Sequence, residues 1–177
     1  MTELYVVFSV AGTEYGVPAR FVSQLETYQG KTQVPGTAKH VTGIVQVRGR
    51  VVPLVDLREL FGHPPLEPTI DTRIVVVEQG ARRVGLLVDK GREVLRVDPT
   101  QIQATPELVE EHSRGFFGGL VQLGPRLIML LDLQEVLGEE TAHERSAQRL
   151  EAGPGDRAAL PQPADAGAEA PGLARER

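Results

Sequence analysis

Two aspartates, Asp56 and Asp132, occupy matching positions in two copies of a repeated segment. A pair of carboxylates can perform general acid–base catalysis, so these two side chains are the clearest candidates for catalytic residues in the chain. Each is followed three residues later by a glutamate, Glu59 or Glu135. This spacing is typical of the start of a helix, where the aspartate caps the first turn. Because a fold needs the cap in both copies and a catalytic pair need not follow the repeat, we interpret both aspartates as helix caps.

The other residues that could carry chemistry lack the pattern that they would need. The four histidines, at positions 40, 63, 112 and 143, show no metal-binding spacing. The tripeptide GKT at 30–32 ends like a phosphate-binding loop, but Leu25 stands where the first glycine of that loop is required. The chain has no GxSxG motif and no cysteine. The sequence therefore predicts no enzymatic activity, no cofactor and no metal.

The segments that carry the two aspartates are copies of one sequence of twenty residues. Residues 43–62, GIVQVRGRVVPLVDLRELFG, align without a gap with residues 119–138, GLVQLGPRLIMLLDLQEVLG, at an offset of 132 − 56 = 76. An earlier pair of segments, YGV around Gly16 and VGL around Gly85, aligns at an offset of 85 − 16 = 69. The chain therefore consists of one small unit that has been duplicated, and the second half has seven extra residues (76 − 69), most simply within 98–114.

Short, valine-rich runs closed by Gly, Pro or charged residues dominate both halves and predict strands. The predicted strands are 4–11, 14–18, 22–28, 42–47, 50–55, 73–79, 82–89, 92–97, 119–123 and 126–131. We interpret the glycines at 16 and 85, each inside a strand, as bulges or corners of a curled sheet. Five short curled strands in each half favour an all-β fold of two small closed barrels. A short helix is expected at 106–112.

We expect one ordered region, 1–138, with a first barrel at 4–62 and a second at 72–138; whether the halves exchange strands is left open. The Pro-rich segment between them, 62–71, is expected to be extended. Residues 139–152 could form a short helix. Residues 153–177 have few large apolar side chains to offset the entropy of ordering, so we predict a disordered tail.

Charge and composition exclude several classes of partner. The net charge is −5, and residues 1–138 carry 14 basic and 16 acidic side chains, without the basic face of a nucleic-acid-binding protein. The first residues lack the basic and apolar regions of a signal peptide, and no apolar run approaches the roughly 18 residues of a membrane span. We therefore expect a cytoplasmic protein with no nucleic-acid partner and no direct insertion into the membrane.

The two copies differ informatively at the turn of their hairpin. The turn reads VRGR in the first copy and LGPR in the second, so Arg48 aligns with Gly124. The fold does not require an arginine there, whereas the next arginine, Arg50 or Arg126, is kept in both copies. An exposed guanidinium beside apolar residues such as Val47 suits a protein interface, where arginine is enriched. A merely solvated surface arginine is the alternative.

The segment GIVQVRGRVVPLVDL, which begins at Gly43, resembles the signature of the CheW family of chemotaxis coupling proteins. In that signature a Gly-x-x-Asn-Leu-Arg-Gly hairpin precedes a strand that ends in Pro, two hydrophobic residues, Asp and Leu. The segments EYGV at 14–17, RRVGLLVD at 82–89 and RLIMLLDL at 126–133 are similar to further family segments, in the same order. The resemblance covers residues 4–138, nearly all of the part that we expect to be ordered.

The resemblance implies two five-stranded SH3-like barrels with a hydrophobic groove between them. It also implies a non-enzymatic scaffold that joins the regulatory domain of a CheA-type histidine kinase to the cytoplasmic tip of a methyl-accepting chemoreceptor, in an array at the inner face of the membrane. In the family, the Arg-Gly hairpin and nearby strands of the first half lie at the partner surfaces. The matching residues here are Gln24, Gln46, Val47, Arg48 and Gly49.

Three departures from the family pattern leave other functions open. Gln46 and Val47 replace the Asn and Leu of the signature, Gln24-Leu25 replaces a frequent Glu-Ile, and a long tail is appended. The protein could serve a dedicated array for motility or another output, or it could be a CheW-like regulator that binds the kinase without a receptor. A duplicated small-barrel enzyme is the third alternative, and a deep pocket with converging titratable groups would favour it.

Overall fold

The computed structural model describes residues 1–37, 41–65 and 67–138, and short strands make up most of this part of the chain. The strands are β1 (Glu3–Val10), β2 (Thr13–Pro18), β3 (Val22–Thr27), β4 (Val41–Val47), β5 (Arg50–Asp56), β6 (Arg73–Gln79), β7 (Arg82–Val88), β8 (Lys90–Val97), β9 (Ile102–Gln103), β10 (Phe117–Leu123) and β11 (Arg126–Leu131). The α-helices are α1 (Leu57–Leu60), α2 (Glu107–His112) and α3 (Leu133–Gly138). All ten predicted strands and the helix predicted at 106–112 are present, whereas the sequence did not predict β9. The helix predicted at 139–152 and the tail predicted at 153–177 lie outside the described residues.

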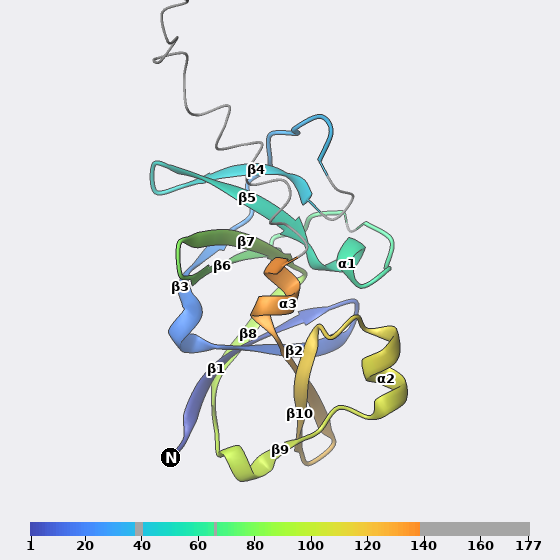
Figure 1. Cartoon of the computed structure of the whole chain (residues 1–177). Helices are drawn as coiled ribbons and strands as arrows, with labels where there is room; N and C mark the ends of the chain where they lie inside the picture. Colours follow the sequence, from blue (N-terminus) through green and yellow to red (C-terminus); the bar gives the residue numbers. More distant parts are fainter. Residues whose placement is uncertain (38–40, 66, 139–177) are drawn as a thin grey trace, which may run out of the picture.

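The strands form two sheets, which Figure 1 shows one above the other. One sheet has the order β8-β1-β2-β11-β10-β9 and the other the order β3-β6-β7-β5-β4. The all-β fold class of two related five-stranded units is confirmed, with β9 as an additional edge strand. Each sheet contains strands from both copies, because the first hairpin of each copy lies in the sheet of the other copy. The ranges 4–62 and 72–138 are therefore repeats in the sequence, and neither range corresponds to a single sheet.

The exchange of hairpins is the same in both directions, because the two sheets share one pattern of pairing. In one sheet β11 runs parallel to β2 and places Leu130 opposite Gly16. In the other sheet β5 runs parallel to β7 and places Leu54 opposite Gly85. The two leucines are equivalent in the twenty-residue repeat, and the two glycines are equivalent in the earlier alignment. The duplication seen in the sequence is thus also a duplication of topology.

Gly16 and Gly85 do not lie at bulges, so the first of the two interpretations of these glycines was wrong. The pairing of β2 with β1 and of β7 with β6 is regular through both glycines. A β-carbon added at Gly85 would lie 2.8 Å from Cγ2 of Ile74 and 3.3 Å from Cδ1 of Leu54. A β-carbon added at Gly16 would lie 3.1 Å from Cδ2 of Leu130. The two glycines, which lie on the exchanged hairpins, are therefore needed because side chains of neighbouring strands pack closely against the backbone there, Leu130 at Gly16 and Ile74 with Leu54 at Gly85.

Strand β9 has a counterpart in the first copy that is shorter still. β9 pairs with β10 opposite Leu120, and at the equivalent place Thr32 forms an isolated bridge with Ile44 of β4. The amide of each residue of this bridge donates to the carbonyl of the other, at 2.9 and 2.8 Å. A β-carbon at Gly43 would overlap the Thr32 carbonyl, so the close approach of this edge segment accounts for the first glycine of the repeated motif.

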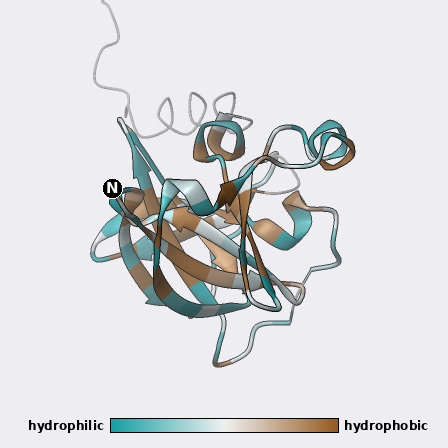
Figure 2. Cartoon of the chain, turned by 90° about the horizontal axis from the view of Figure 1, so that it is seen from below, coloured by the Kyte–Doolittle hydropathy of each residue, from teal (hydrophilic) through white to brown (hydrophobic). Residues whose placement is uncertain are grey.

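The hydrophobic core has three parts that follow the sheets. One cluster lies within each sheet, around Val121 and Ile128 in the six-stranded sheet and around Val52 and Leu54 in the other. The third and largest contains buried residues of both sheets together with the apolar side of α3, and it holds the two sheets together. Its members are Phe8, Val10, Tyr15, Val17, Val55, Leu57, Val75, Val77, Val84, Leu86, Val88, Phe116, Leu131, Leu133, Val136 and Leu137. Figure 2 shows the hydrophobic residues concentrated on the strands and hydrophilic residues on many of the connecting turns.

The repeated aspartates are helix caps, as the sequence predicts. The Asp56 carboxylate accepts a hydrogen bond of 2.8 Å from the backbone amide of Arg58 at the start of α1. Asp132 accepts one of the same length from the amide of Gln134 in α3. Asp56 is only 6% exposed. This burial raises the pKa of its carboxyl group above the ordinary value of 3.8, although the amides of Arg58 and Glu59 offset part of the rise.

The raised pKa of Asp56 predicts how the Asp56→Asn variant differs from the unaltered protein as the pH changes. Because ionisation costs more in the folded than in the unfolded chain, the contribution of Asp56 to stability is most favourable below the ordinary pKa and is lost as the pH rises through the folded-state pKa. Asparagine keeps a capping oxygen without the charge. We expect Asp56→Asn to be more stable than the unaltered protein near pH 7, and this difference to shrink as the pH falls toward about 4. Urea unfolding across this pH range measures the free energy of unfolding of both proteins. If the stability difference between them widens at low pH, the raised pKa of Asp56 is contradicted.

A second acid, Asp89, connects the two sheets. It lies between β7 and β8, and its carboxylate accepts two hydrogen bonds from Arg58, from Nε at 2.7 Å and from Nη2 at 2.6 Å. The same carboxylate accepts a hydrogen bond of 2.8 Å from the amide of Ala11, in the turn between β1 and β2. The Arg58 and Asp89 side chains are each 19% exposed. The ion pair thus joins α1, at the end of the five-stranded sheet, to a hairpin of the six-stranded sheet.

Candidate functional site

The hairpin of β4 and β5 ends in a strained two-residue turn. Val47 pairs with Arg50, which leaves Arg48 and Gly49 as the residues of the turn. Both have positive φ angles, 47° and 79°, and this is the geometry of a type I′ turn. Glycine adopts this conformation freely, whereas an arginine in it costs about 1 kcal/mol or more. Strain of this kind in a residue other than glycine is concentrated at functional sites.

The second copy shows which residue suits this turn position without strain. Gly124, the equivalent of Arg48, also has a positive φ, 58°. The fold therefore favours glycine at this place in both copies, and the first copy has an arginine in spite of that preference. The Arg48 side chain is 74% exposed, so packing within the fold does not account for it.

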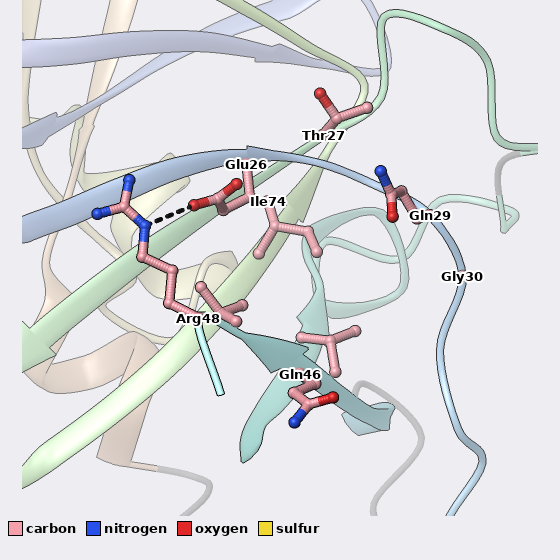
Figure 3. Close-up of a pocket in the computed structure, with 9 residues that line it drawn as sticks. Glu26, Thr27, Gln29, Gly30, Gln46, Arg48 and Ile74 are labelled. Atoms are coloured by element: carbon pink, nitrogen blue, oxygen red, sulfur yellow. Dashed lines mark ion pairs between the residues drawn. The ribbon is translucent and has the colours of Figure 1, made fainter. Parts of the chain in front are cut away.

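Arg48 lies beside a small pocket, which we call the hairpin pocket (Figure 3). Its volume is about 250 Å³, and it is lined by Glu26, Thr27, Gln29, Gly30, Val45, Gln46, Val47, Arg48 and Ile74. The valines and Ile74 are at most 7% exposed and form an apolar floor. Nε of Arg48 lies 3.5 Å from Oε1 of Glu26, which β3 contributes at the margin of the pocket. The pocket thus combines an apolar floor with one acid, one base and several amide groups.

The structure brings together some of the site residues that the sequence predicts. Gln46 and Arg48 are exposed beside the hairpin pocket, and Gly49 is at the tip of the turn. Val47 also lines the pocket, and its side chain, which is 4% exposed, belongs to the core. Gln24 is partly buried on β3 and does not line the pocket, and its Oε1 has no hydrogen-bond partner among the residues that the structure describes.

Sequence reasoning missed Glu26, the ion-pair partner of Arg48. The family pattern directs attention to the acid that is often found at position 24, where this chain has Gln24. Glu26 lies two residues further along the same strand and therefore on the same face. A comparison of the two copies could have found it, since β3 has Glu26 where β8 has Leu95 (95 − 69 = 26).

The two arginines that the repeat keeps at 50 and 126 have different surroundings. Nε of Arg126 lies 3.0 Å from Glu14, and its Nη2 lies 2.5 Å from Glu93. Hydrogen bonding to Arg126 lowers the pKa of the Glu14 carboxyl. Among the described residues Arg50 takes part in no ion pair, and Gln24 occupies the place equivalent to Glu93 (93 − 69 = 24). Of the two retained arginines, Arg126 is therefore the one that ion pairs hold within the fold.

A larger groove lies between the two sheets, beside α1 and α2; we call it the aromatic groove. It has a volume of about 740 Å³. Its lining includes Tyr15 of β2, Phe61 just after α1, and Phe116 and Phe117 at the start of β10. The ring centroids of Tyr15 and Phe61 are 4.9 Å apart, and those of Phe61 and Phe117 are 5.6 Å apart. α2 adds Leu108, which is 74% exposed.

The described residues, 1–37, 41–65 and 67–138, contain neither a metal-binding cluster nor a membrane-spanning helix. In these ranges no three side chains of His, Asp or Glu lie close enough together to hold a metal ion. The same ranges contain no helix with the length and apolar character that crossing a membrane requires.

Comparison with known proteins gives a consistent set of relatives. Residues 4–141 match the family of CheW-like domains. The chemotaxis protein CheW of Bacillus subtilis is 32% identical over 140 residues, which cover 79% of this chain and 90% of that protein. The chemotaxis protein CheW of Rhizobium meliloti is 32% identical over 135 residues, which cover 76% of this chain and 87% of that protein. The crystal structure of the scaffolding protein TtCheW from Thermoanaerobacter tengcongensis matches with a TM-score of 0.68 at 29% identity, over 75% of this chain and 86% of that one.

Proposed function

The chain belongs to the family of CheW-like domains, and on this basis we propose that it couples a CheA-type histidine kinase to the cytoplasmic tip of a chemoreceptor. The family consists of non-enzymatic adaptors, so the chain is a scaffolding protein and not an enzyme. The kinase would bind through its regulatory domain, and the complex would lie in the cytoplasm, in receptor arrays at the inner face of the membrane.

The observation that carries the proposal is the strained arginine of the hairpin. Arg48 has a backbone conformation that glycine would adopt at less cost, and its side chain is largely exposed. A residue that lowers the stability of its own turn and packs little within the fold is best explained by a contact with another molecule. Arginine suits this role because its planar group can bind carboxylates in two places and pack against apolar surface.

The aromatic groove supports coupling to a receptor as well as to the kinase. A CheW-like regulator that binds only the kinase would not need an open apolar groove between the two sheets, and a polar or blocked groove would favour that alternative. Phe61, Phe117 and Leu108, none of which is buried, line an open groove here. Apolar side chains of this kind are what the side of a receptor helix would contact.

Replacement of Arg48 by glycine tests the proposal. We expect Arg48→Gly to weaken binding to the kinase regulatory domain or to the receptor tip by roughly tenfold or more, as loss of an interfacial arginine does. The free energy of unfolding is expected to stay the same or to rise by about 1 kcal/mol, because glycine relieves the strain in the turn. Titration calorimetry with each partner measures the affinity, and thermal unfolding measures the stability.

The matched control is Arg50→Ala, which removes an equal charge two residues away. Arg50 is exposed and lies next to the turn, so its loss should change either affinity by less than about threefold. If Arg48→Gly binds both partners as tightly as the unaltered protein, Arg48 is only a solvated arginine and the assignment of this hairpin to a partner is wrong.

A further inference from the structure

The hairpin pocket has an equivalent in the second copy, and strand pairing identifies it. β3 pairs with β6 so that Glu26 is opposite Ile74. β8 pairs with β1 so that Leu95 is opposite Tyr5. The offset of 69 relates the residues of the two pairs. Leu95 is equivalent to Glu26 (95 − 26 = 69), and Tyr5 is equivalent to Ile74 (74 − 5 = 69).

The equivalent place in the second copy is filled by apolar side chains. Tyr5 is 6% exposed, and Leu95 and Leu123 pack against the cluster to which it belongs. In the first copy these three positions hold Ile74, Glu26 and Val47, and a space of about 250 Å³ remains between them. A smaller side chain and a carboxylate in place of leucine both weaken apolar packing. The combination of a carboxylate with smaller apolar side chains is thus a feature of the first copy, where stronger apolar packing is given up.

The chemistry of the pocket fits one kind of occupant. The apolar floor, made by Val45, Val47 and Ile74, can pack against a hydrocarbon stem. Glu26 at the margin provides a negative charge, and within the described part of the chain its ion-pair contact is with Nε of Arg48, at 3.5 Å. An ion pair that involves so exposed an arginine is weak and is exchanged readily. Lysine and arginine are the side chains that combine a long apolar stem with a cationic head.

We propose, on the basis of the function proposed above, that the hairpin pocket binds one lysine or arginine side chain of the protein partner. The stem of this side chain lies on the valines and Ile74, and its head replaces Arg48 at the Glu26 carboxylate. Arg48 is then released toward the partner and pairs with an acidic group there. The surface that docks on the hairpin therefore carries a basic and an acidic side chain next to each other, and Glu26 selects for this charge pattern.

Two variants test the pocket separately from Arg48. Glu26→Gln removes the charge and keeps the shape, and the triple variant Glu26→Leu, Val47→Leu, Ile74→Tyr reproduces the filled second copy. We expect each to weaken binding by roughly tenfold or more for the kinase regulatory domain or for the receptor tip, as loss of a charge-assisted hydrogen bond does. We expect thermal stability to be unchanged in the first variant and unchanged or higher in the second. Titration calorimetry and thermal melts on the full chain measure both.

The control is Glu78→Gln, which makes the same change at an exposed glutamate of β6 outside the pocket and paired with Arg83. Its affinities should stay within about twofold of the unaltered protein. If Glu26→Gln binds both partners normally while Arg48→Gly does not, the pocket does not bind a basic side chain of the partner, and the proposed function stands. If the unaltered protein binds neither partner, the proposed function fails, and the proposed occupant fails with it.

Discussion

Replacement of Asp89 by alanine is expected to lower the free energy of unfolding by about 3 kcal/mol, or the melting temperature by roughly 10 °C. The change leaves the Arg58 guanidinium, which is 19% exposed, without the carboxylate that accepts two hydrogen bonds from it. It also removes the acceptor of the Ala11 amide. Loss of one member of a largely buried ion pair is costly because the remaining charge stays out of water.

The control for Asp89 is Asp71, whose pair with Lys90 is 3.4 Å long and about half exposed on both sides. Asp71→Ala should change stability by less than about 1 kcal/mol. A double replacement, Arg58→Met with Asp89→Leu, should recover most of the loss, because it leaves no buried charge unpaired. Denaturant unfolding of the four proteins measures these differences. Equal effects of Asp89→Ala and Asp71→Ala would show that the junction between the sheets does not depend on this pair.

The second large effect is expected at the exchanged strands. Gly85→Ala should cost about 1–3 kcal/mol, because its β-carbon would lie 2.8 Å from Cγ2 of the buried Ile74 and 3.3 Å from Cδ1 of the buried Leu54. Gly16→Ala should cost less, because its nearest contact is 3.1 Å from the end of the Leu130 side chain. Gly91→Ala should be neutral or slightly stabilising, because the nearest contact there is an ordinary 3.5 Å and alanine restricts the unfolded chain.

The order of the three glycine variants in thermal unfolding is the measurement, with Gly85 the most costly and Gly91 the least. Combining Gly85→Ala with Ile74→Ala, which removes the crowded methyl group, should cost less than the sum of the single changes. Strict additivity of the two changes, or equal melting temperatures for all three alanine variants, would contradict close packing of side chains against the backbone at Gly85.

Much of the fold follows from local patterns in the sequence. The ten long strands were predictable because each is a valine-rich run that ends at Gly, Pro or charged residues. The caps at Asp56 and Asp132 were predictable because a cap needs only the residues next to it. β9 was missed because two residues are too few to show a pattern. The exchange of hairpins was left open because a strand has the same sequence pattern whichever sheet it joins.

The site was harder to predict than the fold because it depends on contacts between distant segments. Arg48 could be found from one position of the repeat. The burial of Val47 depends on Ile74 and the strands around it, and the role of Gly85 depends on Leu54 from the other copy. Glu26 lies at the pocket only because β3 is placed beside β6. Each of these relations joins residues that are at least 25 positions apart, beyond the reach of a local pattern.

The exchange of hairpins also fixes an order of events during synthesis of the chain. The five strands β3 to β7 occupy the continuous stretch 22–88, so this sheet can close as soon as residue 88 has left the ribosome. The other sheet needs β1 and β2 together with β8, β10 and β11, and it must wait for residue 131. At usual rates of translation the 43 residues between these points (131 − 88) take roughly 2–9 s. Strand β1 can pair with β8 once residue 97 has been made, but β2 lacks its partner β11 until residue 131, so the sheet that contains the N-terminal hairpin is the last to be completed.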